Sequence, residues 1–201
     1  NIARIMDNLI AEKKCKPMIV VMPNGNIAKQ AAAGETFENQ NYKPVMTNFL
    51  PHFKDGTFET AFPEIVDYVD ATFNTKADKA HRAIAGLSMG GLHSVMISAN
   101  YPDLFDYVGL FSAGVNFKDV DMEAFPAYAN LDTKLATQAK KGVKLYWIAI
   151  GKEDQHMNNN KLLMERLDKD GLKYTYHESS RGHIWSNWRQ YTLQFVPQLF
   201  K

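Results

Sequence analysis

A serine between glycines is the feature of this sequence with the clearest chemical meaning. Gly86–Gly91 reads GLSMGG, follows the short apolar run Ala83–Ala85 and opens into a segment with the composition of a helix. A serine on a sharp strand-to-helix turn has strained backbone geometry and projects its hydroxyl above the sheet. Side chains two positions either side of it would collide, so the turn needs Gly86 and Gly90. The pattern predicts Ser88 as a nucleophile, with an ordinary glycine-rich turn as the alternative.

A serine nucleophile needs a histidine base and an acid that orients the histidine. On a strand–turn–helix of this kind, the order along the chain is Ser, then Asp or Glu, then His. Leu145–Ile150 is a continuous apolar run, typical of a buried parallel strand, and Asp154 follows shortly after it. His183 precedes Ser186–Phe200, which is predicted as a helix with its serine as N-cap. The spacing therefore predicts a triad of Ser88, Asp154 and His183.

Each of these residues has a distinct expected role. His183 would take the Ser88 proton as the hydroxyl attacks a carbonyl carbon. Asp154 would hold the imidazole in the right tautomer and stabilise its protonated form. The backbone N–H of Met89, directly after the nucleophile, would donate to the oxyanion. Glu153, next to Asp154, is the alternative acid.

Length and composition predict one globular domain over residues 1–201. The chain is 45% hydrophobic and 12% aromatic, and its net charge of +1 gives no electrostatic footprint for nucleic acid. No apolar run reaches the roughly 18 residues that a membrane span needs. The single cysteine, Cys15, excludes an internal disulfide and a cysteine-based zinc site, and the histidines have no metal-ligand spacing. We therefore expect no metal, no cofactor and no nucleic-acid partner.

Apolar periodicity predicts strands that alternate with helices. The predicted strands are 18–22, 83–85, 107–111, 145–150 and 174–177. The predicted helices are 1–14, 58–73, 92–100, 133–140, 159–169 and 186–200, with Pro63 in the first turn of the second. Such alternation is typical of an α/β fold, in which a mostly parallel sheet has helices on both faces.

The chain also resembles the esterase-D-like α/β-hydrolases, and among them the feruloyl (cinnamoyl) esterases of carbohydrate-esterase family one. The resemblance extends over nearly the whole chain, and the block around His183, with its paired tryptophans, is more specific than the serine turn. The matching stretches are Lys16–Gly25, His81–Gly91, Tyr101–Phe105 and Gly182–Arg189. The resemblance implies an α/β-hydrolase fold with Ser88 as nucleophile, Asp154 as acid and His183 as base.

The sequence departs from this family at its start. Members have preceding strands and a His-Gly loop that provides a further oxyanion donor, whereas this sequence begins within the helix that normally follows that loop. We therefore expect the native protein to be longer at its N-terminus. Without the first strands one edge of the sheet would be exposed, and loss of one oxyanion donor costs about a hundred- to a thousand-fold in rate.

Aromatic residues near the triad are candidates for binding the substrate. A hydroxycinnamoyl group is flat and apolar, so its pocket should have aromatic walls. Trp185, two residues after the predicted base, is expected to form one wall. Phe117, Phe125 and Tyr128 would form a cap over Ser88, with packing in the core as the alternative.

Three other residues close to these are expected to have no direct part in the chemistry. Trp188 and Phe195 fall on the last predicted helix, and their large apolar side chains favour the core. His156 is the histidine nearest to Asp154 in sequence, and a position on the surface is expected for it.

These features together predict a serine carboxylesterase that releases ferulate or p-coumarate from plant cell-wall polysaccharides. Its partner would then be feruloylated arabinoxylan or an oligosaccharide from it, and a polysaccharide substrate favours a secreted or periplasmic protein. Alternatives on the same fold are an acetyl-xylan esterase, an S-formylglutathione hydrolase and an acyltransferase with a sugar hydroxyl as acceptor. The alternative outside enzymes is an inactive carbohydrate-binding relative or fragment.

Overall fold

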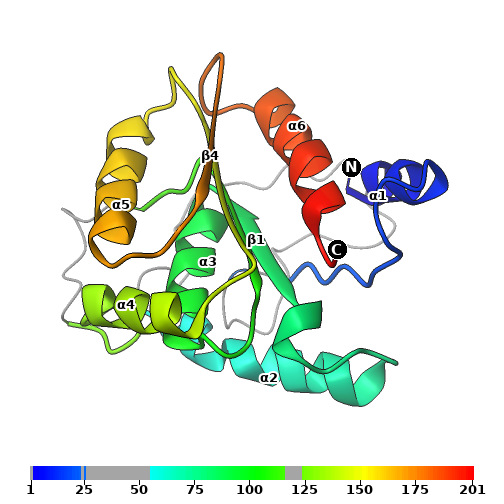
Figure 1. The fold of residues 1–201 in the computed structure, drawn as a ribbon, viewed down its shortest axis with the longest axis horizontal. Coiled ribbons are helices and arrows are strands. Elements are labelled where there is room, and N and C mark those ends of the chain that lie inside the picture. The colour runs from blue at the N-terminus through cyan, green and yellow to red at the C-terminus, as the bar shows by residue number, and fades with distance from the viewer. Residues whose placement is uncertain (1, 24, 26–54, 116–123) are drawn as a thin grey trace, which may run out of the picture.

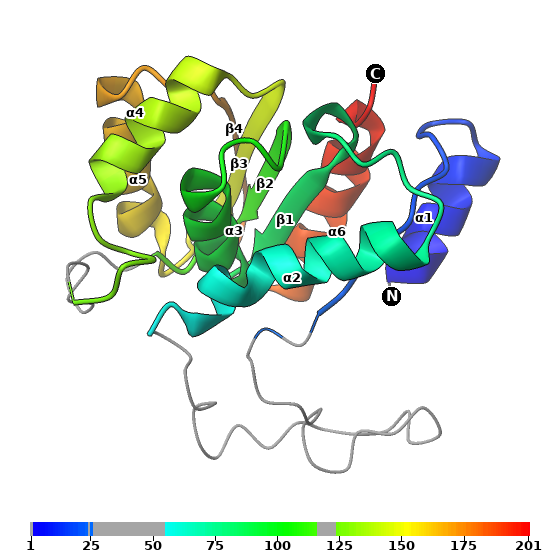
Figure 2. The same ribbon diagram turned by 90° about the horizontal axis from the view of Figure 1, so that it is seen from below.

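A parallel β-sheet lies at the centre of the described structure. The computed structural model describes residues 2–23, 25, 55–115 and 124–201. Its four strands, seen along the sheet in Figure 1, lie in the order of the sequence, each parallel to the next, as Figure 2 shows. They are β1 (Ala83–Leu87), β2 (Tyr107–Phe111), β3 (Leu145–Gly151) and β4 (Thr175–Ser179). Because all four run the same way, their carboxyl ends meet at one edge of the sheet, where ligands bind in open α/β folds.

Helices cover both faces of this sheet. The α-helices of the described residues are α1 (Ile2–Ala11), α2 (Thr57–Thr72), α3 (Met89–Asn100), α4 (Leu131–Lys141), α5 (Met157–Lys169) and α6 (Trp185–Phe195). Figure 2 shows α3, α4 and α5 on one side of the strands and α6 on the other, with α1 beside α6. Helix α2 packs against α3 and crosses the view in front of β1. Among the described residues no helix has the length and apolar character needed to cross a membrane. The predicted α/β architecture, with a parallel sheet between helices, is confirmed.

Each face of the sheet has its own core. Along β2, Val108 and Leu110 enter an aliphatic cluster under α3, whereas Tyr107 and Phe111 enter an aromatic cluster under α6. This is the period-two alternation of a strand, with both faces buried. Every residue of β2 is buried, which explains why the strand reads as a continuous apolar run.

The predicted buried strand at residues 18–22 is wrong. The chain there pairs with no strand in the described part of the molecule, and Met18 alone of the five packs against the core. The other four side chains are 43–71% exposed, namely Ile19, Val20, Val21 and Met22. An apolar run becomes a buried strand only where neighbouring strands supply backbone partners and a covered face, and the described residues supply neither.

Two predictions about helix starts are also wrong. Pro63 lies inside α2, in its second turn, because α2 already begins at Thr57. The Asp55 carboxylate accepts hydrogen bonds from the N–H and hydroxyl of Thr57, at 3.0 and 2.6 Å, which is an Asx turn directly before the helix. Ser186 is not an N-cap, since α6 begins at Trp185 with no side-chain cap bond.

Candidate active site

Ser88 lies on the tight turn between β1 and α3. Its φ of 52° and ψ of −115° are strained for a residue with a side chain. The turn closes because Gly86 has no Cβ: one placed there would lie 2.1 Å from the carbonyl carbon and oxygen of Gly90. A Cβ on Gly90 would meet no atom within 4 Å, so the predicted need for glycine holds at Gly86 and is wrong at Gly90.

Backbone hydrogen bonds hold the strained serine in place. The Ser88 N–H donates to the carbonyl oxygen of Phe111 at 2.9 Å, and the Ser88 carbonyl accepts from the N–H of Gly114 at 2.7 Å. Both partners belong to β2 or the loop after it, so the neighbouring strand fixes the serine on both sides of its Cα. Strain of this kind persists only where the surrounding structure determines it, as it does here.

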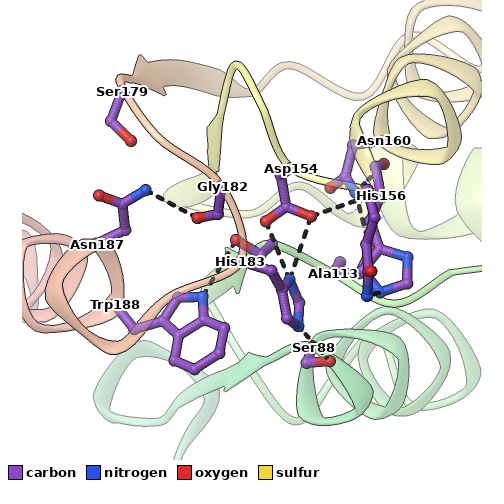
Figure 3. Close-up of polar contacts among 12 residues, drawn as sticks. Ser88, Ala113, Asp154, His156, Asn160, Ser179, Gly182, His183, Asn187 and Trp188 are labelled. Atoms are coloured by element: carbon purple, nitrogen blue, oxygen red, sulfur yellow. Dashed lines mark hydrogen bonds and ion pairs between the residues drawn. The ribbon is translucent and has the colours of Figure 1, made fainter.

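His183 and Asp154 complete a chain of hydrogen-bonded side chains with Ser88 (Figure 3). His183 Nε2 lies 2.9 Å from Ser88 Oγ, and His183 Nδ1 lies 3.0 and 3.2 Å from the two carboxylate oxygens of Asp154. The Asp154 side chain is fully buried, and that of His183 is 21% exposed. These contacts are those that the spacing predicts, and Asp154 rather than the exposed Glu153 faces the imidazole.

The loops that carry the acid and the base are joined through their backbones. The N–H of Lys152 donates to Ser179 at 2.8 Å, and that of Glu153 donates to Arg181 at 3.0 Å. Gly151 permits this approach, because a Cβ there would lie 2.1 Å from the carbonyl oxygen of Arg181. The relative position of Asp154 and His183 is therefore set by main-chain contacts after two adjacent strands.

The Met89 N–H is available as a donor at this site. It is the first N–H of α3, and within the described residues no acceptor is found for it. The first N–H groups of a helix have no intrahelical partner and carry partial positive charge. Its role as an oxyanion donor remains a prediction, and this geometry is compatible with it.

Two rings flank the His183 imidazole. Trp188 meets His183 edge to face, with centroids 4.8 Å apart, and its Nε1–H donates to Ser112 Oγ at 3.1 Å. His156 meets it from the other side in Figure 3, with centroids 5.0 Å apart. The surface position expected for His156 is wrong, because its ring is half-buried against His183. Trp188 and Phe195 lie in the core as predicted.

The residues proposed for substrate binding are spread over different environments. Trp185 is 64% exposed and packs edge to face on Trp188, with centroids 5.0 Å apart. Phe125 is half-buried against the aliphatic core, and Tyr128 is 1% exposed within it. Phe117 lies outside the described residues. For Tyr128, the structure therefore agrees with core packing, the alternative to a cap.

A buried polar cluster that the sequence does not reveal accounts for the position of Tyr128. Its hydroxyl donates to Glu59 Oε1 at 3.1 Å, and His93 Nδ1 lies 2.7 Å from the same oxygen. Glu59 and His93 are 1% and 4% exposed. Burial, followed by the charge of Glu59, raises the pKa of Tyr128 far above its usual range. The cluster joins α2 and α3 to the segment that carries Tyr128.

Two hollows of the described surface lie away from Ser88. One of about 410 Å³ lies between the end of α1 and the C-terminus, beside Cys15 and Pro197. Another of about 330 Å³ lies along α5, beside Arg166 and Lys169. Neither is lined by Ser88, Asp154 or His183.

Comparison with known proteins identifies the family. The model of the Esterase family matches residues 1–199. This chain belongs to the Esterase family. An endo-1,4-beta-xylanase/feruloyl esterase of Xylanibacter ruminicola is 31% identical over 200 residues, which are 98% of this chain and 23% of that protein. An acetyl esterase of Caldicellulosiruptor saccharolyticus is 25% identical over 154 residues, 64% of this chain and 58% of that protein.

The chain therefore spans about a quarter of the first relative and somewhat more than half of the second. Among solved structures, a ferulic acid esterase has a TM-score of 0.72 at 21% sequence identity. The match covers 96% of this chain and 74% of that one. At this identity the likeness shows the fold alone, and it confirms the predicted α/β-hydrolase fold.

Proposed function

We propose that this member of the Esterase family is a serine carboxylesterase that hydrolyses hydroxycinnamoyl esters of plant cell-wall polysaccharides. The observation that carries the proposal is the continuous relay from Ser88 Oγ to His183 Nε2 at 2.9 Å and from His183 Nδ1 to Asp154 at 3.0 Å. A hydroxyl with a base in hydrogen-bond reach, and an acid behind that base, is the arrangement that activates serine.

The first half of the reaction forms an acyl-enzyme. Ser88 Oγ attacks the ester carbonyl carbon while its proton passes to His183 Nε2, and the Met89 N–H donates to the oxyanion. The carbon–oxygen bond to the alcohol then breaks, and His183 returns the proton to the departing alcohol oxygen. Asp154 stabilises the imidazolium that exists between the two proton transfers.

The second half releases the acid. The oxygen of a water molecule attacks the acyl carbon while the water gives a proton to His183 Nε2. The bond between the acyl carbon and Ser88 Oγ then breaks, and Ser88 Oγ recovers the proton from His183. The products are a carboxylic acid and an unchanged enzyme. In the acyltransferase alternative, a sugar hydroxyl takes the place of this water.

Two observations favour the hydroxycinnamoyl substrate. The Xylanibacter ruminicola relative, which aligns with 98% of this chain, carries feruloyl esterase in its name. Trp185 and Ile184 are exposed beside His183, so an aromatic acyl group would find apolar surface next to the ester. A feruloylated arabinoxylan or its oligosaccharides would then be the partner, and the protein would be secreted or periplasmic.

An acetyl ester is the second candidate substrate. The Caldicellulosiruptor saccharolyticus relative is named an acetyl esterase. In addition, an acetyl group is small and needs no long apolar slot beside Ser88.

The test compares two esters on the full-length protein that carries this chain. Initial rates on methyl ferulate and methyl acetate, which share one alcohol, are measured for wild type, Ser88→Ala and Trp185→Ala. Ser88→Ala should lose nearly all activity on both esters while it keeps its fold. Trp185→Ala should impair methyl ferulate much more than methyl acetate, because burial of an aromatic ring contributes on the order of 2–3 kcal/mol.

A different result would contradict each part of the proposal. Wild-type activity in Ser88→Ala would refute the serine mechanism. Faster wild-type turnover of methyl acetate than of methyl ferulate would favour the acetyl esterase. Equal losses on both esters in Trp185→Ala would mean that the tryptophan supports the fold and does not bind the acyl group.

A further inference from the structure

His156 lies against the imidazole on which the proposed reaction depends. It follows Asp154 by two residues and is the N-cap of α5. Its ring meets that of His183 at an interplanar angle of 69°, with centroids 5.0 Å apart (Figure 3). Trp188 meets the same imidazole at 83° and 4.8 Å, so His183 lies between two rings.

The backbone of His156 is fixed by the acid and by a buried amide. Its N–H donates to Asp154 Oδ1 at 2.9 Å, and its carbonyl accepts from Asn160 Nδ2 at 2.9 Å. The same Asn160 amide donates to the carbonyl of Ala113 at 2.8 Å, and Asn160 is fully buried. The backbone from which the His156 ring extends is therefore held by the acid loop and by the loop after β2.

We propose that His156 is a positioning residue for the catalytic histidine, holding the His183 imidazole in line with Ser88 by packing on the side opposite Trp188. The proposal rests on the proposed esterase function. An imidazole supported on both sides cannot rotate about its Cβ–Cγ bond without displacing a neighbouring ring. That restriction matters because a base misplaced by about 1 Å costs on the order of a hundredfold in rate.

The proposal also requires that the His156 ring be uncharged. Among the described residues, the groups whose charge acts on it are His183 and Asp154. Burial lowers the pKa of His156, the charge of His183 lowers it further, and Asp154 opposes both. A neutral ring at this position does not repel the protonated His183 that forms in the reaction, whereas a cation there would destabilise it.

The experiment compares His156→Ala, which removes the ring, with His156→Phe, which keeps an uncharged ring. The readouts are kcat and KM on methyl acetate, with thermal unfolding for each variant. We expect kcat to fall about tenfold in His156→Ala with KM little changed, and to recover to within about threefold of wild type in His156→Phe. The matched control is His81→Ala, which removes an exposed histidine that pairs with Asp78 at the end of the turn Lys79–His81; its kcat and KM should equal those of wild type.

A third variant tests the charge. His156→Lys should lower the midpoint of the acid limb of kcat/KM by about one pH unit, because a nearby cation disfavours protonated His183. Wild-type kcat in a folded His156→Ala, or equal losses in the Ala and Phe variants, would overturn the positioning role. An unchanged acid limb in His156→Lys would overturn the charge requirement. Ser88→Ala separates these results from the proposed function: if it retains activity, the esterase mechanism fails, whatever the His156 variants do.

Discussion

The two glycines around Ser88 permit a sharp test of the turn. In Gly86→Ala the new Cβ would start 2.1 Å from the carbonyl carbon and oxygen of Gly90, so the two backbones must separate by about 1 Å to reach 3.0 Å. Both contacting groups are main chain, and neither can move aside by a side-chain rotation. Overpacking of this kind costs about 1–3 kcal/mol, and in a chain of this length each kcal/mol lowers Tm by roughly 2–4 °C.

The same displacement should affect catalysis. Ser88 lies midway between the two glycines, and its Oγ is 2.9 Å from His183 Nε2. A shift of about 1 Å would break this contact, and misplacement of that size costs on the order of a hundredfold in rate. We therefore expect Gly86→Ala to lower Tm by roughly 2–12 °C and to reduce turnover of p-nitrophenyl acetate by about two orders of magnitude.

Gly90→Ala is the matched control, since it adds the same methyl group four residues later. No atom lies within 4 Å of that Cβ, and Gly90 belongs to α3, where alanine is favoured over glycine by up to about 1 kcal/mol. Its Tm should equal or exceed that of wild type. Thermal unfolding followed by circular dichroism, with rates from the same preparations, checks both variants. Equal changes in Tm, or a wild-type rate in Gly86→Ala, would refute the steric argument.

Three further predictions concern the acid, a buried amide and the pH dependence of stability. Asp154→Asn should lower kcat on methyl acetate by about 10³–10⁴-fold and still leave more activity than Ser88→Ala, because the base survives with poor orientation. Asn160→Ala should lower the urea-derived free energy of unfolding by about 1–3 kcal/mol, since the Ala113 carbonyl loses its side-chain donor while the His156 carbonyl keeps the Asn160 N–H. The Thr75 hydroxyl and then Arg82 lower the pKa of Asp70. The ionised Asp70 carboxylate therefore stabilises the fold at pH values above its pKa in the unfolded chain, and this stabilisation is lost as the pH falls through its pKa in the folded protein. Asp70→Asn should accordingly be less stable than wild type at pH 7 but not at about pH 2.

The triad is predictable from sequence because the topology determines where its members meet. Ser88, Asp154 and His183 each follow a strand, and parallel strands bring their carboxyl ends to one edge of the sheet. Strands β1, β3 and β4 need only exist and run in the same direction for the three side chains to approach one another. Apolar runs predict both conditions, so small errors in the strand ends do not matter.

Other features could not be predicted because they depend on contacts between segments far apart in the sequence. Glu59 is a charged residue near the start of α2, and nothing near it in sequence indicates that His93 and Tyr128 will surround it. His156 has the composition of a surface loop around it, and its burial arises only when the loop after β4 brings His183 against it. The exposure of residues 18–22 likewise depends on which strands lie beside them.

Solvent exposure increases along the site from Asp154 through His183 to Trp185. The residues proposed for the reaction are therefore buried, whereas the residue proposed to bind the acyl group is at the surface. The Asp154 side chain is fully buried, that of His183 is 21% exposed, and Trp185 is 64% exposed. The buried end is fixed by main-chain bonds between the loops after β3 and β4, so its geometry does not depend on which ester is bound. Trp185 packs on Trp188 alone among the aromatic rings of the described residues, and a different residue there would leave the relay unchanged. Substitutions at this rim should therefore change the preferred ester without loss of the serine mechanism, as expected when function lies in a site built on a common fold.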